Sequence, residues 1–394
     1  MPVKNIVILG GGFGGLRAAL NLEKKLGSNP DYQITLIDQN TFHLYTASLY
    51  EVASGELSPH CVLVPYAKIL RGKKIKFLNA TATKLDPRTK AIETSSGEKI
   101  IYWKLVLALG SDTEDFGIKG VGENAVGLKS SADAERIYQH LLRCAVTKGA
   151  PIEVVVGGGG FTGVEIAGEL TQHRKCPLAI TVVEAAPRLL PGMPERISKE
   201  VAKKLNFLGV RVLTSSPIKE VKEQEVTLVS GKKIPTDLTV WTAGVRGSRF
   251  LNPEIFPLDK KKSLLVDKNL RVKGFKDIFA VGDLASTGVA WTATKAEEDG
   301  KVVAHNIAEI AKSKKPSLKP YKVFEPPLIV PAGKKWAIAK VGKIIASGPL
   351  AVVLKNFVLL YYLVTILPLT KALKAWWSGE CEVLQIKTPQ QRIL

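Results

Sequence analysis

The most constraining feature of this 394-residue chain is an internal repeat of a glycine-rich segment. Residues 5–26 (NIVILGGGFGGLRAALNLEKKL) and 153–170 (EVVVGGGGFTGVEIAGEL) each combine an apolar strand pattern, a glycine turn and a helical pattern. Aligning Phe13 with Phe161 superposes two Gly-x-Gly-x-x-Gly motifs, 148 residues apart. One repeat at so long a period indicates two copies of one domain type rather than a solenoid.

In each copy a second strand pattern follows the helix and ends in an acidic residue. Asp38 comes 28 residues after Gly10, and Glu184 comes 26 residues after Gly158. In a dinucleotide-binding βαβ unit the glycines allow a tight turn and a close approach to the pyrophosphate, while the acid bonds ribose hydroxyls. We therefore predict an α/β fold with two Rossmann-like domains. The alternatives are ordinary glycine turns and solvated strand ends.

Two dinucleotide sites in one chain indicate electron transfer between two cofactors. A nicotinamide donates hydride, and a flavin accepts it and passes the electrons on. The protein then supplies orientation, and no catalytic nucleophile is needed. A carboxylate at Glu184 would repel a 2′-phosphate, which predicts a preference for NADH over NADPH that Arg188 could soften.

Charge and cysteine content restrict the partners. The chain carries a net charge of +20, and residues 301–394 hold 15 Lys or Arg against 4 Asp or Glu. Such a basic tail indicates an anionic partner. The four cysteines have no CxxC spacing and no histidine cluster beside them. We expect no metal site and no disulfide framework, and a reducing compartment.

Several sequence blocks together resemble the type II NADH:quinone oxidoreductases, which are single-subunit, non-pumping flavoproteins of the pyridine nucleotide-disulfide oxidoreductase superfamily. The blocks are GGGFGGL (10–16), FHLYTASLYEVASGEL (42–57), LVLALGS (105–111), LKSSADA (128–134), GGGFTGVEIAGEL (158–170), VEAAPRLLPGM (183–193), WTAGV (241–245) and FAVGDLA (279–285). The glycine loops mark only the superfamily, whereas YEVASGEL, GVEIAGEL and LLPGM are more specific. The redox cysteine pair of disulfide reductases is absent near Phe42, His43 and Leu44.

The resemblance implies FAD at the first glycine loop and NADH at the second. It implies FAD contacts at Gly10, Gly12, Gly15, Asp38 and Asp283, NADH contacts at Gly158, Gly160, Gly163 and Glu184, and further cofactor contacts at Phe13, Gly14, Gly110 and Gly244. It also implies that Glu165 approaches the nicotinamide and quinone side of the flavin as a catalytic residue. The alternative for Glu165 is a helix N-terminal acid favoured by the helix dipole.

One stretch departs from the family pattern. The family has Ala-Gln-x-x-x-Gln along the quinone site, whereas this chain has Thr294 and Glu298 in place of the glutamines. Glu298 could relay protons to a reduced quinone, since quinone reduction takes up two protons. The alternative is a solvated helix face comprising Lys295, Glu297, Glu298, Asp299 and Lys301. His43 could bond a cofactor or be a packed structural residue.

The predicted domain ranges are 1–112 and 245–330 for FAD, 113–244 for NADH and 331–394 for membrane attachment. The apolar run 357–369 would extend ~20 Å as a helix, short of the ~30 Å hydrocarbon core. Lys371, Lys374, Trp376 and Trp377 follow and suit the headgroup level. We expect a monotopic anchor on anionic lipid. A single span and a dimerisation or core helix are the alternatives.

The leading hypothesis is a membrane-associated NADH dehydrogenase of a respiratory chain, which passes electrons from NADH through FAD to a quinone without pumping protons. Its expected partners are the quinone, the anionic lipid surface of the cytoplasmic face of the cell membrane, and a possible second copy in a homodimer. The alternative is a soluble NADH-dependent flavin reductase for another acceptor, such as an electron-carrier protein. A basic nucleic-acid or lipid-binding module is a third interpretation, but no aromatic-basic nucleic-acid motif occurs, and we expect no nucleic-acid partner.

Overall fold

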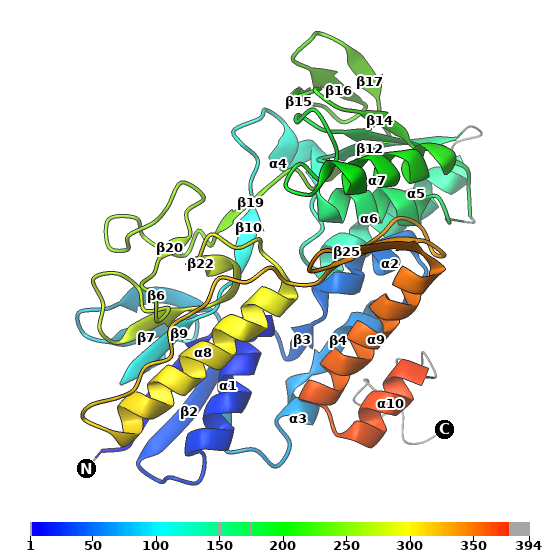
Figure 1. The fold of residues 1–394 in the computed structure, drawn as a ribbon. Helices are drawn as coiled ribbons and strands as arrows, with labels where there is room; N and C mark the ends of the chain where they lie inside the picture. Colours follow the sequence, from blue (N-terminus) through cyan, green and yellow to red (C-terminus); the bar gives the residue numbers. More distant parts are fainter. Residues whose placement is uncertain (1, 148–150, 174, 378–394) are drawn as a thin grey trace, which may run out of the picture. The chain divides into compact units, whose positions relative to one another are not determined.

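The computed structural model describes residues 2–147, 151–173 and 175–377, and it divides the chain into two compact units (Figure 1). Unit 1 comprises Met1–His43, Val64–Asp112 and Arg246–Pro326, and unit 2 comprises Leu44–Leu63, Thr113–Val245 and Pro327–Leu394. The predicted domain ranges remain a prediction, because compactness does not show which cofactor a unit binds. They differ from the compact units at residues 44–63 and 327–394, which both group with unit 2.

Unit 1 is built on a five-stranded parallel sheet with the strand order β21-β9-β1-β2-β5. Its strands are β1 (Lys4–Leu9), β2 (Tyr32–Asp38), β5 (Ile75–Asn79), β6 (Ala82–Asp86), β7 (Ala91–Thr94), β8 (Lys99–Ile101), β9 (Lys104–Leu107), β20 (Leu264–Leu265), β21 (Ile278–Ala280) and β22 (Ala285–Ser286). Its helices are α1 (Phe13–Leu26), α3 (Tyr66–Ile69), α8 (Ala293–Lys312) and the 3₁₀ turn η3 (Gly282–Leu284). Strands β6, β7 and β8 form an antiparallel sheet of their own.

Unit 2 repeats this plan in the order β11-β18-β12-β13-β14, again parallel. Its strands are β11 (Ala125–Val126), β12 (Ile152–Gly157), β13 (Leu178–Val183), β14 (Arg211–Leu213), β15 (Ile218–Val221), β16 (Glu225–Leu228), β17 (Lys233–Pro235), β18 (Leu238–Trp241), β23 (Leu328–Pro331), β24 (Ala337–Val341) and β25 (Ile344–Gly348). Its helices are α2 (Leu49–Ser54), α4 (Val121–Asn124), α5 (Ser131–Thr147), α6 (Phe161–Leu170), α7 (Glu195–Phe207), α9 (Pro349–Ile366), α10 (Leu369–Trp377) and the 3₁₀ turns η1 (Thr46–Ser48) and η2 (Pro59–Val62).

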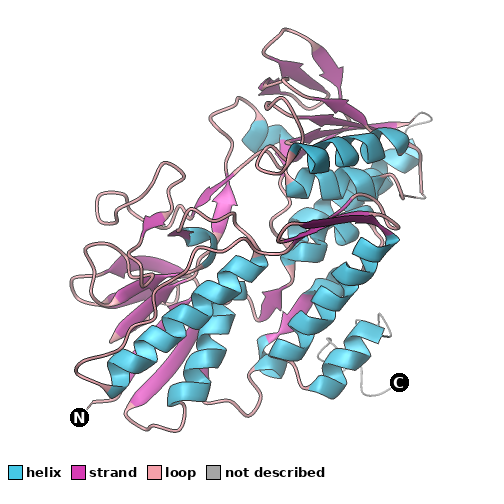
Figure 2. Ribbon diagram, in the orientation of Figure 1, coloured by secondary structure: helices cyan, strands magenta, loops and turns pink. Residues whose placement is uncertain are grey.

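The remaining strands lie where the chain passes from one unit to the other. They are β3 (Phe42–Leu44) with β4 (Leu63–Pro65), and β10 (Ser111–Thr113) with β19 (Val245–Gly247). Figure 2 shows the helices and strands of the fold, and in chain order a strand, a helix and a second strand follow one another at each glycine loop. The prediction of an α/β fold with two Rossmann-like units is thus confirmed.

The glycine loops follow the central strand of each parallel sheet, as the repeat predicts. In unit 1, β1 pairs with β2 from Lys4↔Tyr32 to Leu9↔Ile37. In unit 2, β12 pairs with β13 from Ile152↔Leu178 to Gly157↔Val183. Because the carboxyl ends of parallel strands meet at one edge, each glycine loop lies beside the acid that ends the neighbouring strand.

Helix α8 packs against helix α1 in unit 1, where Figure 1 shows them side by side. Small residues allow the close approach, since a Cβ atom at Gly300 would lie 2.5 Å from the carbonyl oxygen of Gly14. Arg17 of α1 forms an ion pair with Glu297 of α8. Thr292 caps α8 by accepting a hydrogen bond from the backbone N–H of Lys295. Helix α8 is therefore tied to the helix that begins at the first glycine loop.

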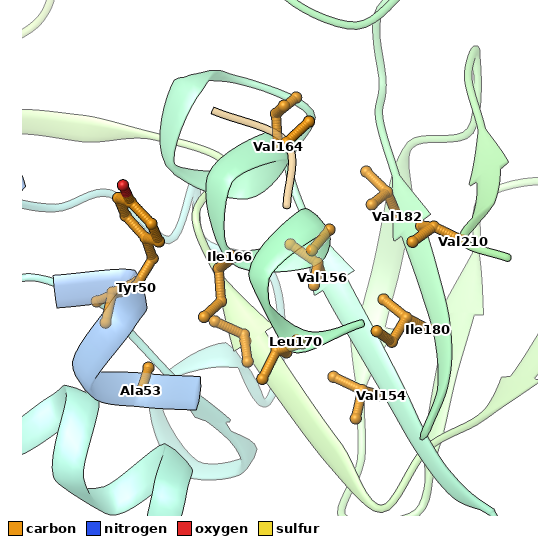
Figure 3. Packing of buried hydrophobic residues seen from close by; sticks show 14 of the residues in the cluster. Tyr50, Ala53, Val154, Val156, Val164, Ile166, Leu170, Ile180, Val182 and Val210 are labelled. Carbon is orange, nitrogen blue, oxygen red and sulfur yellow. The ribbon is translucent and has the colours of Figure 1, made fainter. Parts of the chain in front are cut away.

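The core of unit 2 is apolar and lies on both sides of helix α6 (Figure 3). Val154 and Val156 of β12 pack on one side of α6, and Tyr50 and Ala53 of α2 lie on the other. The turn after β23 also contacts α6, because a Cβ atom at Gly168 would lie 2.6 Å from the backbone nitrogen of Gly333. The second glycine helix is thus covered by α2 and a β-turn rather than by a long helix.

The tail forms a helical hairpin of α9 and α10. Leu367 is extended and Pro368 follows, which ends α9 before α10 begins at Leu369. The indole N–H of Trp376 donates a hydrogen bond to the carbonyl oxygen of Asn356 (2.8 Å), and the rings of Trp376 and Phe357 lie 5.9 Å apart. The second helix therefore folds back along the first.

The cysteine prediction needs a correction. Cys144 and Cys176 are free thiols, whereas Cys61 is disulfide-bonded. The expectation of no disulfide framework is corrected at this one position, because the absence of CxxC spacing does not exclude a single disulfide bond. Cys381 lies outside the described residues.

Candidate active site

The first glycine loop has the geometry of a phosphate cradle. Gly10 has a φ of +100°, which side chains rarely tolerate, and a Cβ atom at Gly15 would lie 1.9 Å from the carbonyl oxygen of Gly10. A Cβ atom at Gly12, by contrast, would meet nothing within 4 Å. The outer two glycines are thus required by the turn itself, and the middle glycine faces open space at the N-terminus of α1. That is the arrangement a pyrophosphate requires.

Asp38 is held against this loop. Its Oδ2 atom accepts a hydrogen bond from the backbone N–H of Gly11 (2.6 Å), and its Oδ1 atom accepts one from the N–H of Asn40 (2.8 Å). The buried hydroxyl of Tyr66 donates to the carbonyl oxygen of Gly11 (2.8 Å) and lies 3.3 Å from Asp38 Oδ2. The carboxylate therefore has a fixed position from which its remaining lone pairs can accept ribose hydroxyls.

His43 supports the same loop from within the protein. It is fully buried, its Nδ1 atom lies 3.0 Å from the carbonyl oxygen of Gly11, and its ring meets that of Phe13 edge-on at 5.0 Å. Burial lowers the pKa of His43 to about 4, so its imidazole is neutral near pH 7. Of the two interpretations from the sequence, these contacts favour the packed structural histidine.

The second glycine loop repeats the first. Gly158 has a φ of +107°, a Cβ atom at Gly163 would lie 1.9 Å from the oxygen of Gly158, and one at Gly160 would meet nothing within 4 Å. The Oε2 atom of Glu184 accepts a hydrogen bond from the N–H of Gly159 (2.6 Å), and its Oε1 atom accepts one from the N–H of Ala186 (2.7 Å). This second cradle fits a dinucleotide as well as the first does.

The other predicted cofactor residues lie near these loops or on neighbouring strand ends of their own unit. In unit 1, Asp283 lies in the turn η3, where its Oδ2 atom accepts a hydrogen bond from the hydroxyl of Ser111 (2.7 Å), directly after Gly110. Gly14 is buried against Val281, near the start of that turn. In unit 2, a Cβ atom at Gly244 would lie 2.5 Å from the ring of Phe116.

Unit 2 gathers three carboxyl groups and a lysine around α6. Glu165 and Glu169 lie one turn apart on α6, and Glu51 of α2 forms an ion pair with Lys355 of α9 (2.8 Å). The Lys355 ammonium also lies 5.0 Å from the ring centre of Tyr50. The Tyr50 hydroxyl is buried without a hydrogen-bond partner in the described structure. Polar groups of α2, α6 and α9 thus meet at one place.

Burial decides the protonation of this cluster. It raises the pKa of Glu165 to about 8, against the opposing effect of Lys355, and it raises the pKa of Glu169 to about 7. The pKa of the Tyr50 hydroxyl is also raised by burial. Glu165 is therefore mostly protonated at pH 7, and can donate a proton.

The alternative interpretation of residues 295–301 as a solvated helix face needs a correction. Glu298 is 39 % exposed and pairs with Lys301, but Lys295 and Asp299 are both 0 % exposed and pair with each other (2.8 Å). Burial raises the pKa of Asp299 to about 6, against the effect of Lys295. Spacing places residues 295 and 299 on one helix face, but it does not show that the Gly282–Leu284 turn covers that face.

Several residues of these sites were not predicted from the sequence. They are Tyr66 under the first loop, the buried Lys295–Asp299 pair, and the groups that interact electrostatically with Glu165, which are Tyr50, Glu51 and Lys355. Tyr50 and Glu51 lie in the family-specific block 42–57, which was the available signal. Among residues 2–147, 151–173 and 175–377, no group of three or more His, Cys, Asp or Glu could hold a metal ion.

Comparisons with known proteins agree on the family. Residues 4–300 match the pyridine nucleotide-disulphide oxidoreductase family. A type II NADH:quinone oxidoreductase of Staphylococcus aureus (strain NCTC 8325 / PS 47) is 33 % identical to this chain over 336 residues, which cover 78 % of this chain and 82 % of that relative.

Solved structures share the fold at lower identity. The structure of NDH2 from Plasmodium falciparum in complex with NADH has a TM-score of 0.79 at 19 % identity, and the match covers 95 % of this chain and 99 % of that one. The sulfide:quinone oxidoreductase of Aquifex aeolicus has a TM-score of 0.79 at 21 % identity, with 95 % of each chain covered. At these identities the likeness shows the fold alone.

Proposed function

Because this chain belongs to the type II NADH:quinone oxidoreductases of the pyridine nucleotide-disulphide oxidoreductase family, we propose that unit 1 holds FAD, unit 2 holds NADH, and a quinone receives the electrons. The observation that carries the proposal is the duplicated cradle, in which Gly11 and Gly159 each donate a 2.6 Å hydrogen bond to the acid of the next strand. The soluble flavin-reductase alternative is not favoured, since the 33 % identical relative is a quinone reductase by name.

The residues of unit 1 bind and orient the flavin cofactor. Bound FAD supplies the chemistry of accepting hydride from NADH and of passing electrons to the quinone. The glycine loop places backbone N–H groups and the helix α1 N-terminus toward the pyrophosphate, and Asp38 accepts ribose hydroxyls. Asp283, whose carboxylate accepts a hydrogen bond from Ser111, would contact the ribityl and pyrophosphate region of the bound cofactor.

The residues of unit 2 bind NADH in the same way. Gly160 leaves room for the pyrophosphate, and Glu184 accepts the hydroxyls of the adenine-side ribose. The Glu184 carboxylate is fixed by two backbone N–H groups and cannot turn away from a 2′-phosphate without losing both bonds. This arrangement favours NADH over NADPH.

We assign the role of proton donor to Glu165. Reduction of a quinone consumes two protons with two electrons, and a buried acid with a pKa near 8 holds a proton at neutral pH. Lys355 and Glu51 connect this position to the tail helix α9, from which a lipid-soluble quinone would arrive. Glu298, half-exposed and paired with Lys301, remains a second candidate for proton transfer.

The tail carries an apolar face suited to one leaflet of a membrane. The exposed apolar residues of α9 recur at three- and four-residue spacing along one stripe, and α10 adds two more; they are Leu350, Val353, Leu354, Phe357, Val358, Tyr361, Leu369 and Leu373. The 18 residues of helix α9 have a mean hydropathy of 1.8, and only 22 % of them are buried. By length and composition alone, this helix could cross a membrane.

The hairpin favours monotopic attachment over a span. Since Trp376 folds back onto Asn356, near the middle of α9, the chain turns back along α9 after Leu367 rather than continuing away from it. Lys371 and Lys374 of α10 add positive charge for anionic headgroups. We place the protein on the cytoplasmic face of the cell membrane; a homodimer remains a prediction.

The test of the catalytic assignment compares two electron acceptors. Glu165→Gln should lower kcat for a quinone analogue by about 10- to 100-fold, because quinone needs protons. Reduction of ferricyanide, which takes electrons alone, should remain near the wild-type rate. Glu195→Gln, on the exposed face of α7, is the matched control. An equal loss with both acceptors would contradict proton donation and indicate a role in NADH oxidation.

The test of membrane attachment uses charge substitutions on the exposed stripe. Phe357→Glu should abolish sedimentation with anionic vesicles and quinone reduction in liposomes, while ferricyanide reduction persists. Phe207→Glu is the control, since Phe207 is an exposed aromatic residue on α7. If both variants still bind vesicles as the wild type does, the anchor lies elsewhere and the tail assignment is wrong.

A further inference from the structure

The first unit contains an ion pair with no contact to solvent. Lys295 and Asp299 lie one turn apart on α8, both are 0 % exposed, and the lysine Nζ atom lies 2.8 Å from Asp299 Oδ2. Lys295 lies within, and Asp299 directly after, the stretch 293–298 where the chain departs from the glutamine pattern of its family. A buried lysine is rare without a specific partner set.

Both side chains bind the backbone of the η3 turn. The Lys295 ammonium donates hydrogen bonds to the carbonyl oxygens of Gly282 (2.6 Å) and Ala285 (3.1 Å), as well as to Asp299. The backbone N–H of Gly282 donates to Asp299 Oδ2 (2.9 Å). All three ammonium donors are therefore used, and the pair holds the turn at both of its ends.

The held turn contains Asp283. Gly282 adopts a left-handed conformation with a φ of +70°, which directs the chain from β21 into η3. The Asp283 carboxylate accepts a hydrogen bond from Ser111, and its backbone carbonyl accepts one from the Ser263 hydroxyl (3.1 Å). Lys295 and Asp299 bind the residues that flank Asp283 and leave its side chain to other partners.

Stability alone does not account for the pair. Removing two charges from water costs more than their attraction returns unless all their polar atoms are paired. The Oδ1 atom of Asp299 is buried without a hydrogen-bond partner in the described structure, which adds to that cost. A buried polar group retained at such a cost indicates a requirement for one specific geometry.

Helix α8 also contacts the other predicted flavin-binding segment of unit 1. Its Gly300 packs on the backbone of Gly14, in the glycine-loop helix α1. One helix thus touches the glycine loop through small residues and the Asp283 turn through an ion pair. A helix with both contacts fixes the distance between the two segments.

We propose that Lys295 and Asp299 are positioning residues for FAD, which hold the Gly282–Leu284 turn so that Asp283 meets the cofactor. The proposal rests on the proposed FAD contact of Asp283. It predicts that loss of the pair weakens FAD binding even when the protein remains as stable as before.

The experiment compares FAD affinity with apoprotein stability in four proteins. In the double variant Lys295→Met with Asp299→Leu, an apolar pair replaces the ion pair, so the apoprotein should melt near the wild-type temperature. Its Kd for FAD, titrated by flavin fluorescence, should rise about tenfold or more. Lys104→Met, which breaks the ion pair with Asp277 at the start of β9, should lower the melting temperature without changing the Kd.

Asp283→Asn separates the proposal from its premise. If Asp283→Asn weakens FAD binding but the double variant binds FAD like the wild type, the positioning role is overturned and the FAD site stands. If Asp283→Asn leaves the Kd unchanged, the premise itself fails. If the double variant does not fold, amide hydrogen exchange of wild-type apoprotein decides: Gly282 should be protected without FAD, and rapid exchange there would overturn the proposal.

Discussion

The two glycine-loop helices share a sequence pattern and differ in what covers them. Position 17 of α1 and position 165 of α6 are equivalent in the repeat. Arg17 is buried in an ion pair with Glu297 of the long helix α8. Glu165 instead faces α2 and the tail helix α9, and burial raises its pKa to about 8. The equivalent position of the motif thus holds an arginine that binds a neighbouring helix in unit 1, and a buried, protonated glutamate in unit 2.

The loops themselves differ in the residue beneath them. A Cβ atom at Gly11 would lie 2.1 Å from the Tyr66 hydroxyl, whereas one at Gly159 would lie 2.4 Å from the Leu189 side chain. The first loop therefore has a polar support that bonds Gly11 and Asp38, and the second has an apolar support. The glycine motif therefore gives both loops the same backbone geometry, while the residue beneath each loop decides whether its support is polar or apolar.

The largest expected effect comes from filling each cradle separately. Gly12→Val should give protein without visible flavin absorbance, because the added side chain enters the space of the pyrophosphate. Gly160→Val should keep its flavin and lose NADH oxidation by about 100-fold or more. Flavin-to-protein ratios and steady-state rates check both, and stoichiometric flavin in folded Gly12→Val protein would reverse the assignment of the loops.

The next largest effect should be the loss of stability when the Arg17–Glu297 ion pair is removed. Arg17→Met leaves Glu297 unpaired at 13 % side-chain exposure, and an unpaired, largely buried charge costs roughly 3 kcal/mol. Urea unfolding should report that loss, and Arg17→Met with Glu297→Leu should recover most of it. A single variant as stable as the wild type would show that this ion pair does not hold α1 on α8.

Neutralising Glu184, the acid beside the second glycine loop, should change the preference between NADH and NADPH. Glu184→Gln removes the repulsion of a 2′-phosphate but keeps an oxygen that accepts from Gly159. The ratio of kcat/KM for NADH over NADPH should fall about tenfold, mainly through KM. Wild-type protein that already prefers NADPH would contradict this role and direct attention to Arg188.

The last expected effect is a pH dependence of stability that is specific to unit 2. The folded pKa of Glu165, about 8, exceeds its ordinary value of 4.5, so the folded state keeps a proton that the unfolded state releases. This contribution to stability is complete below about pH 4.5 and is lost as the pH rises through about 8. Glu165→Gln does not titrate, so its stability relative to the wild type should rise by about 4 kcal/mol from pH 5 to pH 9, at about 1.4 kcal/mol for each pH unit below the folded pKa. Parallel unfolding curves at both pH values would contradict the burial of this acid.

The sequence by itself determined the two βαβ units and their acids. Glycine spacing, strand pattern and the positions of Asp38 and Glu184 are local features, because each βαβ unit lies within about forty residues and its turn geometry demands glycine. The structure bears this out in the registers of β1 with β2 and β12 with β13. Which cofactor each loop binds came from the family resemblance, not from spacing.

Only the tertiary structure decided which polar residues are buried. Residues 295–301 appear in the sequence as one charged helix face, yet Lys295 and Asp299 lie under the η3 turn while Glu298 stays half-exposed. The contacts of Tyr66 and Lys355 could not be predicted from the sequence either, since their hydrogen-bond partners lie 55 and 304 residues away along the chain. The burial and the pKa of a side chain depend on which distant segments pack around it, and a local sequence pattern does not determine that packing.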